Sequence, residues 1–235
     1  MKTITFLIAI LITTSGAYSQ VMPNDFNRGI AKFKTQDYKG AIVDFTKAIA
    51  ANPQDEMAFY NRGLSKSKLD DTNGAIGDYS KAIEIDPQFS TAYYSRGNGK
   101  GILGDYKGAI IDLNKAIEID PGYADAFNIR ATSKLLLRDF NGAIADFSKA
   151  IAIDPTNEWF YDSRGNAKSF IKDYNGAIAD CTKAIGINPQ YAESYYNRGL
   201  AKINLGQKES GCIDLKKAEE LGFAGAKEAI TKFCQ

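Results

Sequence analysis

The residues of this sequence that could form a catalytic or binding site are charged residues that recur at fixed intervals. Six arginines recur every 34 residues, and six aspartates follow them sixteen residues later: Arg28, Arg62, Arg96, Arg130, Arg164 and Arg198, then Asp44, Asp78, Asp112, Asp146, Asp180 and Asp214. No two carboxylates stand apart from this period, as a general acid and its partner base would. Histidine, the commonest general base and imidazole metal ligand, is absent. We therefore expect no catalytic residue, no metal site and no cofactor.

The overall charge gives no sign of a strongly charged partner. Lys and Arg together number 29, against 28 Asp and Glu. A protein that binds nucleic acid through its phosphates would carry a basic excess. Nucleic acid is therefore not an expected partner.

The first 19 residues have the three parts of a secretory signal peptide. Lys2 precedes an apolar stretch over 4–12, and the small residues Ala17 and Ser19 precede a cleavage point at Ser19–Gln20. An uncleaved anchor is the alternative, although the apolar stretch is shorter than the roughly 20 residues that span a bilayer. We expect an exported chain, periplasmic or extracellular, with no membrane insertion once the signal is removed.

The elements that position the charged columns follow the same 34-residue period. Five prolines mark it at Pro53, Pro87, Pro121, Pro155 and Pro189. Small residues mark it too, in one column at Gly29, Gly63, Gly97, Ala131, Gly165 and Gly199 and in another at Ala48, Ala82, Ala116, Ala150, Ala184 and Ala218. A strict period of this length predicts helix-turn-helix units that bury their apolar faces by stacking on their neighbours.

Within one period, apolar and small residues recur at helical spacing and predict two amphipathic helices. Small side chains are expected where the paired helices approach most closely. Aspartates at the start of each second helix are expected to cap it, because a carboxylate accepts hydrogen bonds from the orphan N–H groups there. These capping residues are Asp37, Asp71, Asp105, Asp139 and Asp173.

These columns resemble the tetratricopeptide repeat family, in its bacterial exported type. The resemblance implies an all-α, right-handed superhelical solenoid of six helix-turn-helix units and a C-terminal capping helix. The chain departs from the family pattern at the arginine column and at a lysine column: Lys32, Lys66, Lys100, Lys134, Lys168 and Lys202. The last unit drifts, with Ser210 and Phe223 in the places of glycine and proline, and 217–222 resembles a Sel1-like repeat.

The expected organisation is a signal peptide over 1–19, six repeats over 22–225 and a capping helix over 226–235. The repeats are 22–55, 56–89, 90–123, 124–157, 158–191 and 192–225.

In the resembled family the first helices line the concave face, and this implies a peptide-binding groove. Its expected residues are Phe26, Tyr60, Leu64, Tyr94, Asn98, Asn128, Thr132, Asp162, Asn166, Tyr196 and Leu200. Aromatic rings supply contact area with little entropy to lose, and amides bond to a peptide backbone. In the alternative interpretation the tyrosines only complete the packing between adjacent helices.

Matched charges in opposite helices suggest a ladder of Arg–Asp ion pairs through the stack. The alternative is independent, solvated charges. If the pairs were exposed, each would contribute only ~0.2 to 1 kcal/mol.

Three cysteines allow three pairings, and we favour a disulfide between Cys212 and Cys234. It would join the last repeat to the capping helix in an oxidising compartment and leave Cys181 as a buried thiol.

The favoured function is a non-enzymatic scaffold that binds a polypeptide segment in its concave groove and organises an envelope or surface complex. A carbohydrate-binding or hydrolytic protein with its site in the same groove is the alternative, because Trp159 and the tyrosines could stack on sugars. A membrane-tethered scaffold differs only in whether the signal is cut. The sequence identifies neither the polypeptide partner nor the oligomeric state.

Overall fold

The computed structural model describes residues 24–235, and the predicted signal peptide lies outside these residues. The described part folds into thirteen α-helices and contains no β-strand. By its internal contacts the chain divides into two compact units, Met1–Ile85 and Asp86–Gln235.

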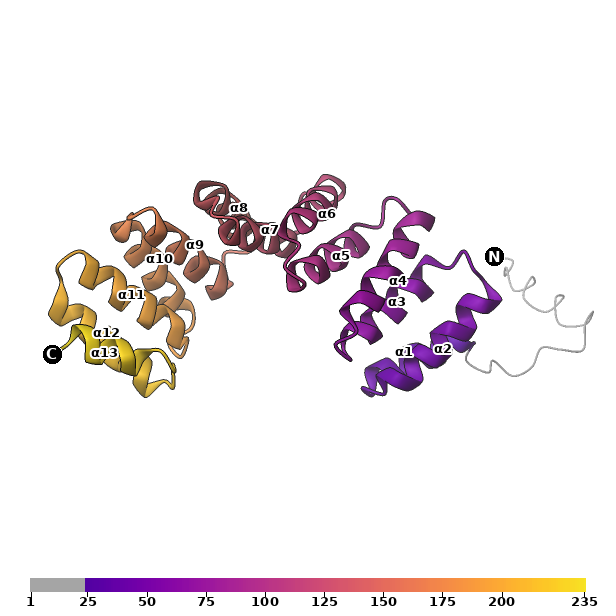
Figure 1. Cartoon of the computed structure of the whole chain (residues 1–235), viewed down its shortest axis with the longest axis horizontal. Helices are drawn as coiled ribbons and strands as arrows, with labels where there is room; N and C mark the ends of the chain where they lie inside the picture. Colours follow the sequence, from indigo (N-terminus) through magenta and orange to yellow (C-terminus); the bar gives the residue numbers. More distant parts are fainter. Residues whose placement is uncertain (1–23) are drawn as a thin grey trace, which may run out of the picture. The chain divides into compact units, whose positions relative to one another are not determined.

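The first unit contains four helices (Figure 1): α1 (Asp25–Lys34), α2 (Tyr38–Ala51), α3 (Glu56–Ser67) and α4 (Thr72–Ile85). The second unit contains nine: α5 (Ser90–Ile102), α6 (Tyr106–Ile119), α7 (Ala124–Leu136), α8 (Phe140–Ile153), α9 (Glu158–Phe170), α10 (Tyr174–Ile187), α11 (Ala192–Asn204), α12 (Lys208–Glu220) and α13 (Ala226–Phe233). Each predicted repeat range contains one pair of helices.

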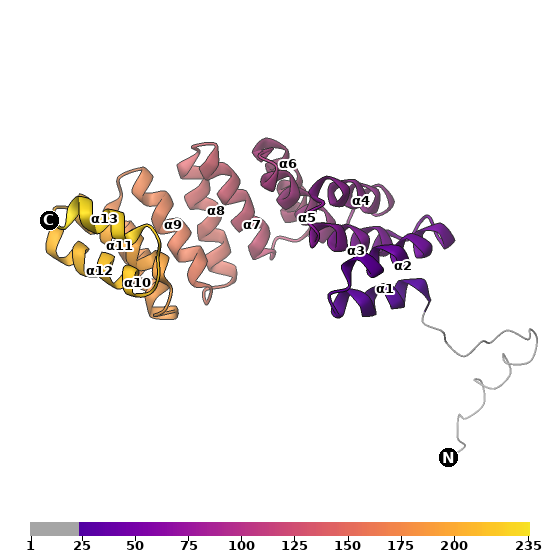
Figure 2. The same cartoon turned by 60° about the horizontal axis from the view of Figure 1, so that its bottom comes forward.

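Consecutive helices pack against one another within each unit, as the row from α7 to α12 illustrates (Figure 2). First helices of successive repeats also touch, for example α5 with α7 and α9 with α11. The predicted all-α architecture of stacked helix pairs is therefore confirmed. None of the helices in 24–235 combines the length and apolar character that crossing a membrane requires.

The aspartate caps form as predicted. In five repeats the cap carboxylate accepts a hydrogen bond of 2.9 Å from the backbone N–H of a glycine three residues later. These glycines are Gly40, Gly74, Gly108, Gly142 and Gly176. A Cβ at any of them would lie 2.0–2.2 Å from the cap carboxylate, so a larger residue there would displace the cap. The sixth repeat has Gln207 and Ser210 at the two positions, and Gln207 makes no side-chain cap bond.

The small column on the first helices lies under a large side chain from the second helix of the same repeat. A Cβ on Gly63 would lie 2.7 Å from the Tyr79 ring, and one on Gly97 would lie 3.0 Å from Leu113. The opposing column is almost completely buried and consists of Phe45, Tyr79, Leu113, Phe147, Cys181 and Leu215. Small residues therefore permit the close approach of the paired helices, as expected.

Beside this contact, each repeat buries the carboxylate of its column aspartate, which is 2–5% exposed. In the second repeat, Arg62 donates two hydrogen bonds of 2.9 and 2.6 Å to the Asp78 carboxylate. The Lys66 ammonium lies 2.8 Å from the same carboxylate. The other repeats contain the corresponding Arg–Asp–Lys triad. The lysine column thus has a role that the sequence did not indicate.

Four of the arginines also connect successive repeats: Arg62, Arg130, Arg164 and Arg198. Their remaining nitrogen donates to a polar side chain on the preceding second helix, at 2.7 Å from Arg130 to Asn114 and 3.0 Å from Arg164 to Ser148. The predicted ladder of ion pairs is confirmed. The carboxylates are buried, so the small value for an exposed pair does not apply.

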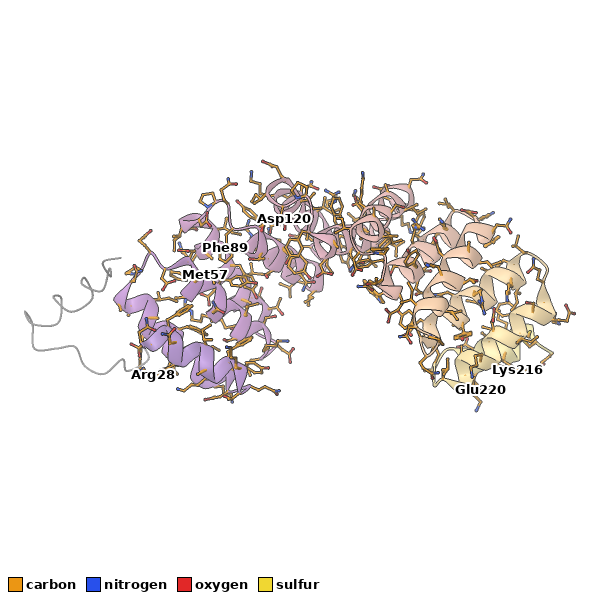
Figure 3. All side chains as sticks on the ribbon, turned by 180° about the vertical axis from the view of Figure 1, so that it is seen from behind. Arg28, Met57, Phe89, Asp120, Lys216 and Glu220 are labelled. Atoms are coloured by element: carbon orange, nitrogen blue, oxygen red, sulfur yellow. A yellow bond between two sulfur atoms is a disulfide. The ribbon has the colours of Figure 1, made fainter. Side chains whose placement is uncertain are left out.

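The C-terminal end is joined covalently. Helix α13 packs against α12, and Cys212 and Cys234 form a disulfide with a Cα–Cα distance of 5.7 Å. Cys181 is a buried free thiol. Lys216 and Glu220 project from the exposed side of α12 (Figure 3).

We predict that Arg130→Met lowers the free energy of unfolding by about 2 to 3 kcal/mol, because it leaves Asp146 buried with one cation in place of two. Chemical denaturation of the full chain measures this. Arg138→Met is the matched control, since it removes the same charge from an exposed position, and its effect should stay within about 0.5 kcal/mol. Equal stability of the Arg130→Met variant and the wild type would contradict the structural role of the triads.

Candidate functional site

A groove over α7, α9 and α11 of the second unit consists of two adjoining hollows. Its first part is a hollow lined by residues that include Thr132, Trp159, Asp162, Asn166, Glu193 and Asn197. Its second part is lined by residues that include Asn166, Phe170, Tyr174, Asn197, Leu200 and Asn204. Asn166 and Asn197 belong to both parts, so the two hollows form one surface, which we name the α7–α11 groove.

Local structure fixes the acidic end of this groove at the start of α9. Asn157 caps α9 and accepts a hydrogen bond of 3.0 Å from the Trp159 N–H. Asn188 donates a bond of 2.9 Å to the Glu158 carboxylate and so connects α9 to the loop before α11. Trp159 stands in the first turn of α9 with its side chain 41% exposed. Met57 holds the equivalent place at the start of α3 (Figure 3).

Four of the predicted groove residues line the α7–α11 groove: Thr132, Asp162, Asn166 and Leu200. Two others in the same unit pack against neighbouring rings. The centroids of Tyr94 and Tyr123 are 4.7 Å apart, and those of Tyr196 and Phe223 are 4.6 Å apart. These two tyrosines therefore contribute to the packing between helices.

The remaining predicted residues are distributed over both units. In the first unit, Phe26 and Tyr60 each lie 5.7 Å from the ring that faces them in the same repeat, and Leu64 is half-buried. In the second unit, Asn98 is half-buried, whereas Asn128 is 5% exposed and its side-chain oxygen accepts no hydrogen bond.

Asp162 is the unusual member of the set because it is a buried carboxylate held by neutral groups. It is 6% exposed, and it accepts hydrogen bonds from the Ser194 hydroxyl at 2.7 Å and from the Asn197 amide at 3.1 Å. The Cys181 sulfur lies 3.8 Å from the same carboxylate. Burial raises the pKa of Asp162, the two hydrogen bonds oppose this shift in part, and the charge of Glu193 adds to it.

The sequence offered a signal for this exception. In each of the other repeats at least one of these two positions holds an aromatic ring, and in the first two repeats the two rings pack on each other, as Tyr60 does on Tyr79. In the fifth repeat both columns depart together, because Asp162 replaces the first ring and Cys181 the second. The smaller thiol leaves room for a polar cluster there.

Several groove residues were not among the predicted site residues. They include Ser163, Phe170, Tyr174, Glu193, Asn197 and Asn204. Asn197 stands one residue before the arginine column, and only the packing of α11 against α9 shows that it reaches Asp162.

We predict that Asp162→Asn does not destabilise the protein at pH 7. The free energy of unfolding of the variant, relative to that of the wild type, should increase as the pH rises from about 4. The folded-state pKa is raised, so the unfolded chain releases this proton at a lower pH than the folded chain does. Ionisation of Asp162 therefore costs folding stability as pH rises through that range, and asparagine removes the cost.

The measurement is urea denaturation across this pH range. Asp146→Asn is the matched control, because the same change at a carboxylate held by Arg130 and Lys134 should destabilise the protein at pH 7. A loss of stability at pH 7 in Asp162→Asn as large as that in Asp146→Asn would contradict the prediction.

Comparison with known proteins agrees with this architecture. The family model of the tetratricopeptide repeat matches residues 58–89, 90–123, 160–191 and 192–221, which is more than half of the chain. No curated protein matches the sequence.

Solved structures share the fold. The crystal structure of YrrB, described as a TPR protein with an unusual peptide-binding site, is 24% identical with a TM-score of 0.68, over 80% of this chain and 97% of that one. The crystal structure of MamA is 27% identical with a TM-score of 0.65, over 70% of this chain and 96% of that one. A tetratricopeptide repeat protein from Parabacteroides merdae is 24% identical with a TM-score of 0.63, over 89% and 81%.

The repeated helix pairs, their caps and small columns and the match to the family model lead to one conclusion. This chain belongs to the tetratricopeptide repeat family.

Proposed function

We propose that this protein is a non-enzymatic scaffold that binds a polypeptide segment in the α7–α11 groove. Proteins of this family generally act as scaffolds for interactions between proteins, and one similar structure is described as having a peptide-binding site. The observation that carries the proposal is the continuity of the groove, since two hollows joined at Asn166 and Asn197 extend over the first helices of successive repeats.

The side chains in this groove suit an extended polypeptide. Asn166, Asn197 and Asn204 provide amide groups along its length, and an amide oxygen can accept a hydrogen bond from a peptide backbone. Phe170 and Leu200 offer apolar area at one end, and Phe170 is 56% exposed. Aromatic and apolar anchors beside backbone-directed polar groups are typical of peptide recognition.

A carbohydrate-binding or hydrolytic protein is the second candidate, and one observation favours it. Trp159 is exposed in the same hollow as Asp162 and Glu193, and an aromatic ring beside carboxylates is suited to stacking and bonding a sugar. Asp162, however, is buried and both of its oxygens accept hydrogen bonds from the protein. An acid–base pair needs carboxyl groups that reach the substrate, so we favour the polypeptide.

We further propose that the chain is exported and works in an envelope or surface complex. The signal-like segment over 1–19 and the disulfide between Cys212 and Cys234 both support this, because disulfides persist mainly in oxidising compartments.

For the exported protein we predict a mature chain that begins at Gln20 and has one alkylatable thiol when it is denatured without reductant. That thiol is Cys181, and reduction should expose Cys212 and Cys234 as well. Intact-mass spectrometry of the protein from its native cells, with and without reductant, measures both features. An intact N-terminus with three alkylatable thiols would contradict the proposal of export.

For the groove we predict that a photoreactive residue in place of Asn166 crosslinks a polypeptide partner in native cells, whereas one in place of Ile213 does not. Ile213 is 69% exposed on α12, a second helix that lines neither part of the groove. Adding Leu200→Arg should abolish the crosslink at position 166, because it places a bulky charge in the groove. Equal crosslinking from both positions, or a crosslink that survives Leu200→Arg, would contradict groove binding.

A further inference from the structure

The charge environment of Asp162 sets it apart from the other buried carboxylates. In 24–235, seven aspartates are buried, and six of them belong to the Arg–Asp–Lys triads. Asp162 is the seventh, and the groups that donate to it are the neutral side chains of Ser194, Asn197 and Cys181. The fold therefore neutralises every buried carboxylate of the described residues with cations except the one that lines the groove.

Further negative charge surrounds this carboxylate. The hollow contains a second carboxylate, that of Glu193, which is exposed, and none of the residues that line the hollow is a lysine or an arginine. Glu158, at the start of α9, adds a third carboxylate nearby, since its charge and those of Asp162 and Glu193 all act on Tyr191. A concave site lined with one sign of charge attracts the opposite sign.

Two aromatic rings complete the hollow. Trp159 and Tyr191 both line it, and Trp159 is the only tryptophan of the chain. The face of an aromatic ring is electronegative and attracts a cation, with indole the most effective of the common side chains. Rings together with carboxylates thus favour a cationic group over a neutral or anionic one.

From these observations we propose that the hollow lined by Trp159, Asp162 and Glu193 receives a lysine or arginine side chain of the polypeptide bound in the α7–α11 groove. This inference rests on the proposed function. Glu193, at the surface, contacts the cation directly, and Asp162 supplies negative charge from beneath it. The Oδ2 atom of Asp162 accepts a hydrogen bond from Asn197 at 3.1 Å, and a carboxylate oxygen can accept more than one.

The second part of the groove specifies another feature of the ligand. Beyond Asn166 and Asn197 it presents Phe170, Tyr174 and Leu200. The matching segment therefore carries a basic side chain and, further along an extended backbone, an apolar one. The carboxylates of the hollow attract the basic side chain locally, so binding does not require the whole protein to carry a net negative charge.

The experiment uses the mature full chain and short alanine-rich peptides, acetylated and amidated, with one leucine and one test residue. The test residue is arginine, glutamine or glutamate, so that the peptides differ in charge at a single position. Binding is followed by the fluorescence and the indole N–H resonance of Trp159, which report on this hollow because the chain has no other tryptophan.

We expect the arginine peptide to bind about tenfold more tightly than the glutamine peptide, and the glutamate peptide to bind most weakly. Asp162→Asn and Glu193→Gln should each reduce the preference for arginine to less than about twofold. Neither variant should be less stable than the wild type, so a loss of preference would not reflect unfolding. Glu219→Gln, which removes the same charge from an exposed position on α12, should change nothing.

Equal binding of the arginine and glutamine peptides would overturn the inference and leave the proposed groove intact. An unchanged preference in Asp162→Asn and Glu193→Gln would overturn it as well, because the cation would then bind elsewhere. Absence of any change at Trp159 with all three peptides would also overturn it. The crosslinking experiment at Asn166 decides the proposed function separately from each of these results.

Discussion

Each repeat of this protein depends on one buried carboxylate held by two cations. The aspartate comes from the second helix, whereas the arginine and the lysine come from the first, so the triad joins the two helices of a repeat. An unpaired charge in that position would be strongly unfavourable, so loss of either cation from a triad lowers the folding stability. In four repeats the arginine also reaches the second helix of the preceding repeat, as Arg130 does to Asn114, and so helps to set the register of adjacent repeats.

This constraint explains how the fold presents a surface for binding. A glycine or alanine on the first helix lets the paired helices approach closely, and the triad fixes them beside that contact. The outward positions of the first helices are then available for residues that differ from repeat to repeat. In the second unit these positions form the α7–α11 groove, and Asp162 is the place where a buried carboxylate is left without the cations that every triad has. The buried charge of Asp162 lowers the folding stability, and a cationic ligand would offset this cost by neutralising the charge.

The sequence predicted the fold well because the period is strict. Six copies of the arginine, aspartate and small-residue columns indicated the helix pairs, the caps and the ion pairs, and the structure contains all of them. It did not indicate the lysine in each triad, since a lysine one turn after an arginine reads equally well as a solvated charge.

The groove was harder to predict because it is formed by contacts between repeats. Position within the period identified Thr132, Asp162, Asn166 and Leu200, but the same rule also selected Tyr196, whose ring packs on Phe223. Which residues of a column face a groove depends on the size of their neighbours, such as Cys181 in place of a ring. That information lies in the packing and not in the period.

Binding of a polypeptide to α7, α9 and α11 is tested most directly by NMR mapping of this protein with a synthetic copy of the segment recovered from a crosslinked partner. We predict that resonance changes on addition of the synthetic segment concentrate on groove residues of α7, α9 and α11, such as Asn166, Asn197 and Leu200. Changes concentrated on the second helices α8, α10 and α12 would contradict it.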